Sequence, residues 1–407
     1  MQPYRYIILG AGPAGLTFAN MLERKGIRDF LVLEAEREAG GLCRSVEVDK
    51  APLDIGGGHF LDVRRPKVNE FLFSFMPENE WNLFTRNTKI ALEGEMIDHP
   101  IEANIWQMDV DKQVEYLLSI ARAGCVTGAP MPQKFVDWIY WKLGKRVAED
   151  YMIPYNSKMF ASDLDALGTY WLDKLPDVSF ENTLRSCLVH HAYGKQPGHA
   201  MFYYPKKYGY GELWLRMAAA VGRHMVYECT VTGLSVRKDG VKEISCADGA
   251  RYQAKRVVTT IPWAALETCG GMPKELWEES AKLRHSSVWV AYEQNQLDTA
   301  AQWIYYPEEE LPYHRILVRH NFCPNSRGYW TETNSVRYQK KDDGFAYLNR
   351  YAYPLNTVDK PKIMDKITDW AVRREIYPLG RWGEHMHYNS DATVQKAMEL
   401  ASQLERD

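Results

Sequence analysis

The fold of this chain is decided by the stretch YRYIILGAGPAGLTFANMLERKGIRDFLVLEAE, residues 4–36. An apolar run at 4–9 is typical of a buried strand, residues 13–25 have the apolar spacing of a helix, and 30–34 form a second apolar run. Strand, helix and strand in so short a stretch predict a βαβ unit, which opens a doubly wound α/β sheet.

The turn after the first predicted strand carries the pattern G-x-G-x-x-G. Gly10 permits a tight turn, Gly12 lets the backbone approach a pyrophosphate, and Gly15 lets the helix pack closely on the strand. Pro13 and Ala14 begin the predicted helix, whose N-terminal amides would face the phosphates. The pattern therefore predicts a site for the pyrophosphate of a dinucleotide.

An acidic residue ends the second predicted strand. Glu34, followed by Ala35, can accept hydrogen bonds from both hydroxyls of an adenosine ribose. Gly41 and Leu42 belong to a second glycine-rich segment, in which Arg44 could reach a diphosphate. We expect residues 1–45 to hold the ADP half of a dinucleotide, although an ordinary surface turn remains an alternative for the second segment.

A third glycine-rich segment, LDIGGGH, covers residues 53–59. Gly57 and Gly58 would bring bare backbone close to a flat ligand and leave the His59 imidazole beside it. A single histidine is more often a structural residue, so both interpretations of His59 stay open.

Length and charge exclude several classes of function. A chain of 407 residues exceeds the roughly 250–300 at which one hydrophobic core stops growing, so at least two substructures are expected. Its 50 basic and 53 acidic residues give a charge of −3, too weak a field to recruit nucleic acid or an anionic membrane. The longest apolar run, 6–21, is interrupted by glycines and is too short to span a bilayer. We expect a soluble, cytoplasmic protein without nucleic-acid or membrane partners.

The cysteines give no sign of a metal site. Seven are present, an odd number, and none belongs to a C-x-x-C pair. This usage fits reduced thiols in a cytosolic protein and provides no ligand set for a metal. They are Cys43, Cys125, Cys187, Cys229, Cys246, Cys269 and Cys323.

Apolar periodicity divides the chain into three expected parts. Residues 1–62, 199–262 and 355–407 together form the dinucleotide-binding domain. Residues 63–198 are rich in aromatic and charged residues at helical spacing and are expected to form a mostly helical insertion. Residues 263–354 alternate apolar and polar residues, as the half-exposed antiparallel sheet of a substrate lobe does.

Shorter signals support this division. Strand patterns return at 225–237 and 256–261, where Pro262 ends the run. Helical patterns follow at 361–375 and 393–404, with the glycine-flanked segment 380–383 expected as a loop.

An acidic second strand followed by Gly-Gly-x-x-Arg resembles flavin amine oxidases, desaturases, protoporphyrinogen oxidases and UDP-galactopyranose mutases. Six further segments, spread over nearly the whole chain, are similar to the mutases in order and spacing. They are 81–105 (ending DHPIEANI), 135–160 (ending MIPYNSKMF), 202–214 (FYYP through GELW), WIYYPE (303–308), YHR (313–315) and GRWG (380–383).

The resemblance implies an FAD-dependent isomerase that is active with reduced flavin. In the mutases, flavin N5 attacks the anomeric carbon of a nucleotide sugar, and the nucleotide diphosphate is released and recaptured while pyranose and furanose interconvert. Such a protein would take a nucleotide-diphosphate sugar and serve polysaccharide assembly. The alternatives are an FAD-dependent oxidoreductase acting on an amine or a lipid-like skeleton, and a non-enzymatic flavoprotein.

The resemblance also implies roles for single residues. His59, Arg315 and Arg381 match catalytic positions, the two arginines on the diphosphate and His59 beside the isoalloxazine. Tyr305 matches a diphosphate tyrosine. Tyr155 and Asn156 match residues that contact the nucleotide, and further cofactor contacts are implied at Val231, Gly380, Asn389, Ser390 and Val394.

Several positions depart from the mutase pattern. His387 stands where the family has a diphosphate tyrosine, with Tyr388 next to it. His99, Glu102 and Phe160 replace Tyr, Gln and Trp of eukaryotic-type mutases, and the family's further arginine has no counterpart in 171–176. We therefore expect an altered substrate pocket. Because many bacterial relatives pair through the helical insertion, a homodimer is also expected.

Overall fold

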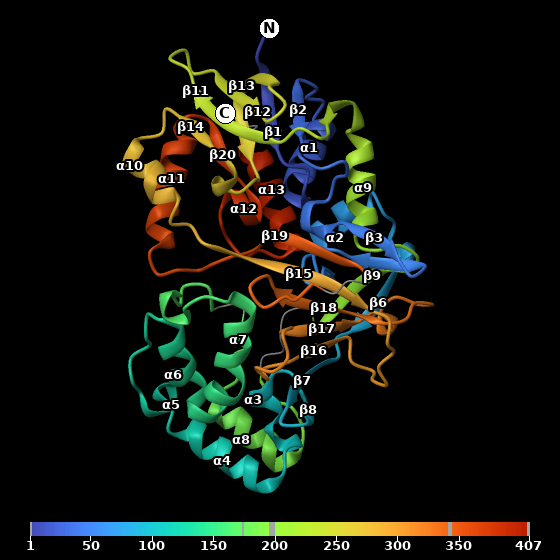
Figure 1. The fold of residues 1–407 in the computed structure, drawn as a ribbon, viewed down its shortest axis with the longest axis vertical. Helices are drawn as coiled ribbons and strands as arrows, with labels where there is room; N and C mark the ends of the chain where they lie inside the picture. The colour runs from blue at the N-terminus through green and yellow to red at the C-terminus, as the bar shows by residue number, and fades with distance from the viewer. Residues whose placement is uncertain (1, 173–174, 195–199, 341–343, 405–407) are drawn as a thin grey trace.

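The computed structural model describes residues 2–172, 175–194, 200–340 and 344–404. The described elements form three layers, from top to bottom in Figure 1: an eight-stranded sheet with helices on its faces, a seven-stranded sheet, and a group of helices. This architecture confirms the predicted α/β class with a Rossmann-like domain.

The eight-stranded sheet is built around the predicted βαβ unit, β1 (Tyr4–Leu9), α1 (Pro13–Arg24) and β2 (Phe30–Leu33). The strand order is β10-β2-β1-β13-β12-β11-β14, with β20 beside β13, and β1 runs parallel to both neighbours. The other strands are β10 (Met225–Val226), β11 (Val231–Val236), β12 (Lys242–Cys246), β13 (Arg251–Thr259), β14 (Thr268–Gly270) and β20 (Ile376–Pro378).

Helices cover both faces of this sheet, which explains why β1 is apolar without alternation. On one face Ile8 belongs to the core formed with α1, α9 (Gly211–Ala220) and α13 (Ser390–Gln403). On the other face Ile7 belongs to the core formed with α11 (Lys360–Val372), which α10 (Lys274–Ser280) adjoins. Neighbouring strand residues point to opposite faces, so each packs into a different core.

The seven-stranded sheet has the order β19-β15-β18-β17-β16-β7-β8. Its strand pairs are antiparallel except β16 with β7, which is parallel. The strands are β7 (Thr88–Leu92), β8 (Glu95–Asp98), β15 (His285–Glu293), β16 (Trp303–Tyr305), β17 (Arg315–Val318), β18 (Tyr329–Asn334) and β19 (Ala346–Pro354).

The helical layer has a core of its own, built on the apolar faces of its helices. Asp109 accepts a hydrogen bond from the Lys112 amide at the start of α4, and Ser179 caps α8 in the same way. The helices are α3 (Ile101–Asn104), α4 (Val110–Ala121), α5 (Gly124–Thr127), α6 (Phe135–Val147), α7 (Ile153–Phe160) and α8 (Phe180–Val189).

The structure differs from the sequence-based prediction in two places. Residues 81–98, within the insertion predicted as mostly helical, contain β6 (Trp81–Thr85), β7 and β8. β6 pairs with the distant β9 (Met201–Pro205), and such long-range pairing overrides local spacing. The predicted loop 380–383 is the single-turn helix α12 (Gly380–Gly383), where the Glu384 carboxylate accepts the Gly380 amide at 2.9 Å.

Short elements connect the layers. β3 (Ser45–Val48) pairs with β4 (Ala51–Asp54), β5 (Leu61–Asp62) pairs with β9, and α2 (Pro66–Phe73) lies against α13. The expected boundary between 198 and 199, and positions 173–174 within 171–176, lie outside the described residues. Among the helices of the described segments, none has the length and apolar run needed to cross a membrane.

Candidate active site

The first glycine turn is packed against its own strand and helix. Gly10 has a φ of +96°, and a Cβ on Gly15 would lie 2.0 Å from the Gly10 carbonyl oxygen, so neither position tolerates a side chain. Gly12 precedes α1 without a side-chain cap, and Pro13 opens the helix. The amides at the start of α1 are therefore disposed to bind an anion.

The second glycine segment lies directly on the first. The Gly40 amide donates to the Ala11 carbonyl at 2.8 Å, and a Cβ on Gly41 would lie 3.3 Å from Cα of Gly12. The Arg44 guanidinium donates to Gly41, Glu36 and Tyr347 at 2.7–3.1 Å. Arg44 thus stabilises the segment. We expected its guanidinium to reach a diphosphate, but in the structure it is hydrogen-bonded to these protein groups.

Glu34 joins these turns at the end of β2. Its carboxylate accepts the Ala11 amide at 2.6 Å and the Glu36 amide at 3.0 Å, while exposed Ala35 lies between. Burial raises the pKa of Glu34 above its usual range. Each carboxylate oxygen can accept a second hydrogen bond, so Glu34 keeps capacity for ribose hydroxyls.

Three further cofactor candidates, Gly380, Ser390 and Val394, come from α12 and α13. A Cβ on Gly380 would lie 2.7 Å from Cβ of Ala14, so α12 packs closely on α1. Asn389 precedes α13, Val394 is buried, and the Ser390 hydroxyl lies 2.7 Å from that of Tyr210.

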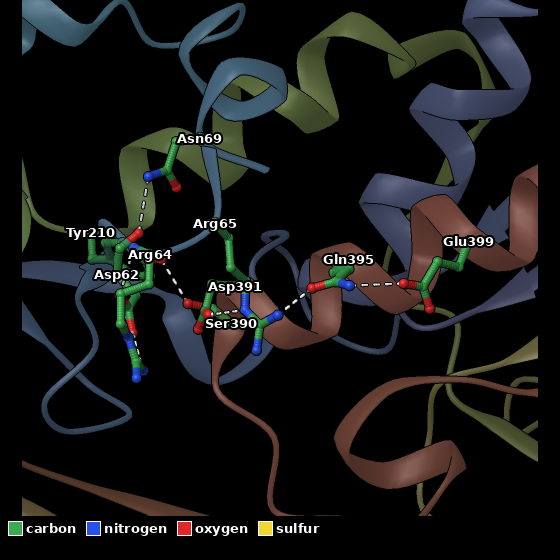
Figure 2. A network of polar contacts seen from close by, with 9 residues as sticks. All are labelled: Asp62, Arg64, Arg65, Asn69, Tyr210, Ser390, Asp391, Gln395 and Glu399. Carbon is green, nitrogen blue, oxygen red and sulfur yellow. Dashed lines mark hydrogen bonds and ion pairs between the residues drawn. The ribbon is translucent and has the colours of Figure 1, made fainter. Parts of the chain in front are cut away.

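The N-terminal part of α13 is held by an ion pair from outside the helix. Figure 2 shows Arg65, which precedes α2, between Asp391 and Gln395 of α13. The Arg65–Asp391 contact is 2.5 Å, and Gln395 continues the network to Glu399. This network fixes the N-terminus of α13 beside the glycine turns.

The third glycine segment meets a buried carboxylate that our sequence-based prediction missed. Glu332 of β18 is 0% exposed and accepts the Gly58 amide at 3.1 Å. A Cβ on Gly57 would lie 2.5 Å from its carboxylate, so glycine is required there. Nδ1 of His59 lies 3.3 Å from the Gly57 carbonyl oxygen, which places the imidazole on this turn.

Arg315 and Arg381 are brought to the same place by Tyr353. Arg315, the first residue of β17, donates to Glu332 at 2.6 Å and to the Tyr353 hydroxyl at 3.2 Å. Its Nε is buried without a hydrogen-bond partner among the described residues. Both arginine charges lower the pKa of Tyr353, although burial has the larger effect and raises it to about 12.

Arg381 carries a buried charge that no nearby carboxylate balances. Its guanidinium donates to the carbonyls of Ala352 and Tyr388 at 2.8–3.1 Å, and within the described segments none of its hydrogen bonds goes to a carboxylate. Burial lowers the pKa of Arg381, and the charge of Arg315 lowers it further. The ring of His387 lies 5.0 Å from that of Tyr353 and so adjoins this cluster.

A second group of candidates surrounds Tyr305. Its ring lies 5.4 Å from His99 and 5.1 Å from Tyr155, and Arg86 donates to its hydroxyl at 2.8 Å. Burial and the Arg86 charge lower the pKa of His99 to about 3, so its imidazole is neutral. Tyr305 pairs with Arg315 between β16 and β17, which joins this group to the arginines.

Other candidates point elsewhere. Phe160 packs on Trp171, and the Asn156 amide donates to its own helix at 2.7 Å. Glu102 lines a separate cleft of about 340 Å³ with Lys142. Tyr388 directs its hydroxyl to Glu384.

Three residues that hold the cluster together, Arg86, Glu332 and Tyr353, were missed from the sequence. Glu332 and Tyr353 lie in strands of the seven-stranded sheet, and Arg86 lies in the short connection between β6 and β7. In the sequence, each is a polar residue in a segment where apolar and polar residues alternate. Such a pattern is common in strands with one exposed face, so it does not indicate a site. Pairing of distant strands turns these residues toward one point.

The eight-stranded sheet with its glycine turns is a Rossmann-like domain joined to a second, largely antiparallel sheet. Residues 8–75 match the family model of NAD(P)-binding Rossmann-like domains. Reduced UDP-galactopyranose mutase superposes with a TM-score of 0.89 at 20% identity, over 100% of this chain and 94% of that one. The fold-level resemblance stated from the sequence is thereby confirmed.

Oxidases share the architecture less closely. A protein described as a protoporphyrinogen oxidase from Exiguobacterium has a TM-score of 0.73 at 14% identity, covering 100% of this chain and 99% of that one. Putrescine oxidase bound to putrescine gives 0.64 at 14% identity, with 100% of both chains covered.

A short stretch of the chain also matches a curated protein in sequence. It is an uncharacterized protein of the nifH2 3′ region of Methanothermococcus thermolithotrophicus, 44% identical over 52 residues. The match spans 13% of this chain and about half the length of that relative, 49%.

Proposed function

We propose that this protein is an FAD-dependent nucleotide-sugar mutase, an isomerase that interconverts pyranose and furanose forms. The observation that carries the proposal is the approach of two arginines to one point of β19: Arg315 donates to the Tyr353 hydroxyl and Arg381 donates to the carbonyl of the neighbouring Ala352. Glu332 compensates one of these charges, and a second anion would compensate the other. The diphosphate of a nucleotide sugar supplies such an anion.

The cofactor site is proposed from the same reasoning. Glu34 would accept the ribose hydroxyls, the start of α1 would face the pyrophosphate, and Gly57 with Gly58 would border the flat ring. The steric closeness of Gly10, Gly15 and Gly57 to their neighbours fits a cleft that admits only backbone beside the ligand. Reduced flavin, when bound, supplies a nucleophile for the anomeric carbon.

The chain's own contribution is to stabilise the leaving diphosphate. Arg315 has an unpartnered Nε, and the two guanidinium groups could hold phosphate oxygens from one strand, β17, and one helix, α12. With its pKa raised to about 12, Tyr353 keeps its proton at neutral pH and can donate it in a hydrogen bond. Tyr305 and Arg86 would border the nucleotide side of the same site.

The test measures binding of UDP and dTDP to the purified flavoprotein by flavin fluorescence. A charge-assisted hydrogen bond contributes about 1.5–3 kcal/mol, so Arg315→Ala or Arg381→Ala should weaken binding about 10- to 150-fold without loss of flavin. Lysine at either position should restore only part of the affinity. Arg373→Ala, which removes an exposed arginine on the sheet's other side, is the matched control. Unchanged affinity in both site variants contradicts the proposal.

The alternative is an oxidoreductase of the amine oxidase type. Such an enzyme turns over in its oxidised form and produces peroxide stoichiometrically, whereas the proposed mutase needs reduced flavin and produces none. Incubating reduced protein with UDP- and dTDP-sugars, followed by chromatography for furanose product, separates the two.

We further propose a cytoplasmic homodimer that serves polysaccharide assembly. Apolar residues at helical spacing are exposed on α4, at Val110, Val114 and Leu118. Leu184 and Leu188 are exposed on α8, which packs beside α4. Adjacent apolar stripes of this kind are typical of a protein interface.

A further inference from the structure

Two buried cysteines lie against one another in the eight-stranded sheet. Sγ of Cys229 and Sγ of Cys246 are 2.9 Å apart, closer than two unbonded sulfur atoms ordinarily lie, although both are free thiols in this structure. Cys246 is the last residue of β12, and Cys229 precedes β11. Because β11 and β12 pair as a hairpin, the strand pairing itself brings the two thiols together.

The segment that carries Cys229 is also hydrogen-bonded to the segment that carries Glu34. The Cys229 amide donates to the Glu34 carbonyl at 2.9 Å, and the Glu34 amide donates to the Val226 carbonyl at 2.8 Å. The Glu228 amide donates to the Glu36 carbonyl at 3.2 Å. Residues 226–229 therefore support, through backbone hydrogen bonds, the segment that carries Glu34, the residue that we propose binds the FAD ribose.

We propose that Cys229 and Cys246 form an intramolecular disulfide when the protein meets a peroxide, and that this bond slows dissociation of FAD. The Cys229 thiolate attacks one peroxide oxygen, which gives a sulfenic acid and releases hydroxide. The Cys246 sulfur then attacks the Cys229 sulfur and expels the sulfenic oxygen as water, while the hydroxide becomes the second water with the proton that the Cys229 thiol lost. In total, two thiols and one hydrogen peroxide give one disulfide and two water molecules.

The structure favours this bond because little movement is needed. The sulfur atoms must approach from 2.9 Å to about 2.05 Å, which rotation of the two side chains can supply. Burial raises the pKa of Cys246 to about 12, so this residue is a thiol at neutral pH and its attack on the Cys229 sulfur is slow. Once formed, the cross-link removes freedom from residues 226–229 and thereby holds Glu34 in place.

The effect on FAD rests on the proposed flavin site, but the disulfide does not. Holoprotein is treated with hydrogen peroxide or with a thiol reductant, and free thiols are then alkylated. Peptide mapping should find Cys229 and Cys246 linked, with the loss of two hydrogen atoms, only after peroxide. Flavin release, measured as the rise of free-flavin fluorescence after dilution, should be several-fold slower in the cross-linked protein.

Two variants and a control make the outcome specific. Cys229→Ser and Cys246→Ala should both abolish the linked peptide and the difference in release rate. Cys125→Ser, which changes a thiol in the helical layer, should keep both. Unlinked Cys229 and Cys246 after peroxide treatment overturn the proposal, and a linked pair with unchanged flavin release overturns its effect on FAD. A protein that binds no FAD contradicts the proposed function, while peptide mapping still decides on the disulfide.

Discussion

At the scale of single residues, Glu332 connects the two halves of the candidate site. One carboxylate oxygen accepts the Gly58 amide and the other accepts Arg315, with the Tyr353 hydroxyl at 3.3 Å. A fully buried carboxylate is stable only when it is paired and hydrogen-bonded. The burial of each charge, the Glu332 carboxylate and the Arg315 guanidinium, therefore requires the other as its partner.

Replacing Glu332 tests this dependence. Glu332→Gln keeps the shape but leaves the buried charge of Arg315 unpaired, so the free energy of unfolding should fall by about 3–5 kcal/mol. UDP should recover part of the loss, because its phosphates supply the missing negative charge. Urea unfolding with and without UDP measures both effects. Glu243→Gln, at a half-exposed ion pair, should change stability by less than 1 kcal/mol. Equal losses in both variants would contradict the assigned pairing.

The residue substitutions around the cluster predict an altered substrate preference. His387 lies beside Tyr353, and His99 beside Tyr305, where the mutases carry tyrosines. A hydroxyl left without its partner in a closed site costs about 1–3 kcal/mol, which corresponds to about 5- to 150-fold in kcat/KM. We expect UDP-galactose to have a lower kcat/KM than another nucleotide hexose or deoxyhexose in a broad panel. His387→Tyr should narrow this gap, and a panel in which UDP-galactose ranks first would refute the prediction.

At the scale of elements, Asp54 joins β4 to β3, β9 and the start of α9. It accepts hydrogen bonds from the Ser45 hydroxyl at 2.5 Å and from the Tyr204 hydroxyl and Tyr210 amide at 3.0 Å. Burial nevertheless raises the pKa of Asp54 to about 7. The Asp54 carboxyl, which is hydrogen-bonded to Ser45 at the end of the second glycine segment, thus titrates near neutral pH.

Asp54 should make stability depend on pH in a definite direction. An aspartate that binds its proton more tightly in the folded state stabilises the fold at low pH, and this contribution is lost as pH rises from about 4 to about 7. Asp54→Asn has a side chain of the same shape that does not titrate, so it serves as the reference. The unfolding free energy of wild type relative to Asp54→Asn should therefore fall by roughly 1–4 kcal/mol between pH 4 and pH 8. A pH-independent difference between the two proteins, measured by urea unfolding, would show that Asp54 is already ionised at pH 4.

At the scale of the whole molecule, the candidate site lies where the layers of Figure 1 meet. The glycine turns and α12 come from the upper layer, and Arg315, Glu332 and Tyr353 come from the seven-stranded sheet. The helical layer contributes Tyr155 from α7 and leaves apolar stripes on α4 and α8. One face of this layer is thus free to bind a second molecule.

Measuring the oligomeric state tests whether the apolar face of α4 and α8 binds a second copy of the chain. Leu118 and Leu188 are 50% and 75% exposed, so charged substitutions there should not disturb the monomer fold. The protein should behave as a dimer in sedimentation velocity, and Leu118→Glu with Leu188→Glu should give monomers with unchanged flavin content. Val336→Glu, at an equally exposed residue after β18, is the control and should remain dimeric. A monomeric wild type at micromolar concentration would exclude the proposed dimer.

The sequence by itself determined the parts of the protein that depend on local physics. The βαβ unit, the glycines at 10, 12 and 15 and the acid at the end of β2 follow from periodicity, backbone freedom and spacing over 36 residues. The antiparallel strands within 263–354 and the helices at 361–375 and 393–404 were predictable for the same reason. The roles given to Arg315 and Arg381 came from resemblance and remain predictions.

Only the tertiary structure decided which side chains meet. Pairing of β6 with β9 made strands where local spacing predicted helix, because hydrogen bonds to residues more than 100 positions away outweigh weak propensities. The register of β17, β18 and β19 brought Arg315, Glu332 and Tyr353 within hydrogen-bonding distance. Glu102, on α3 of the helical layer, instead lines a separate cleft. A side-chain cluster depends on strand register, and register is fixed by packing across the whole molecule, so no local pattern specifies it.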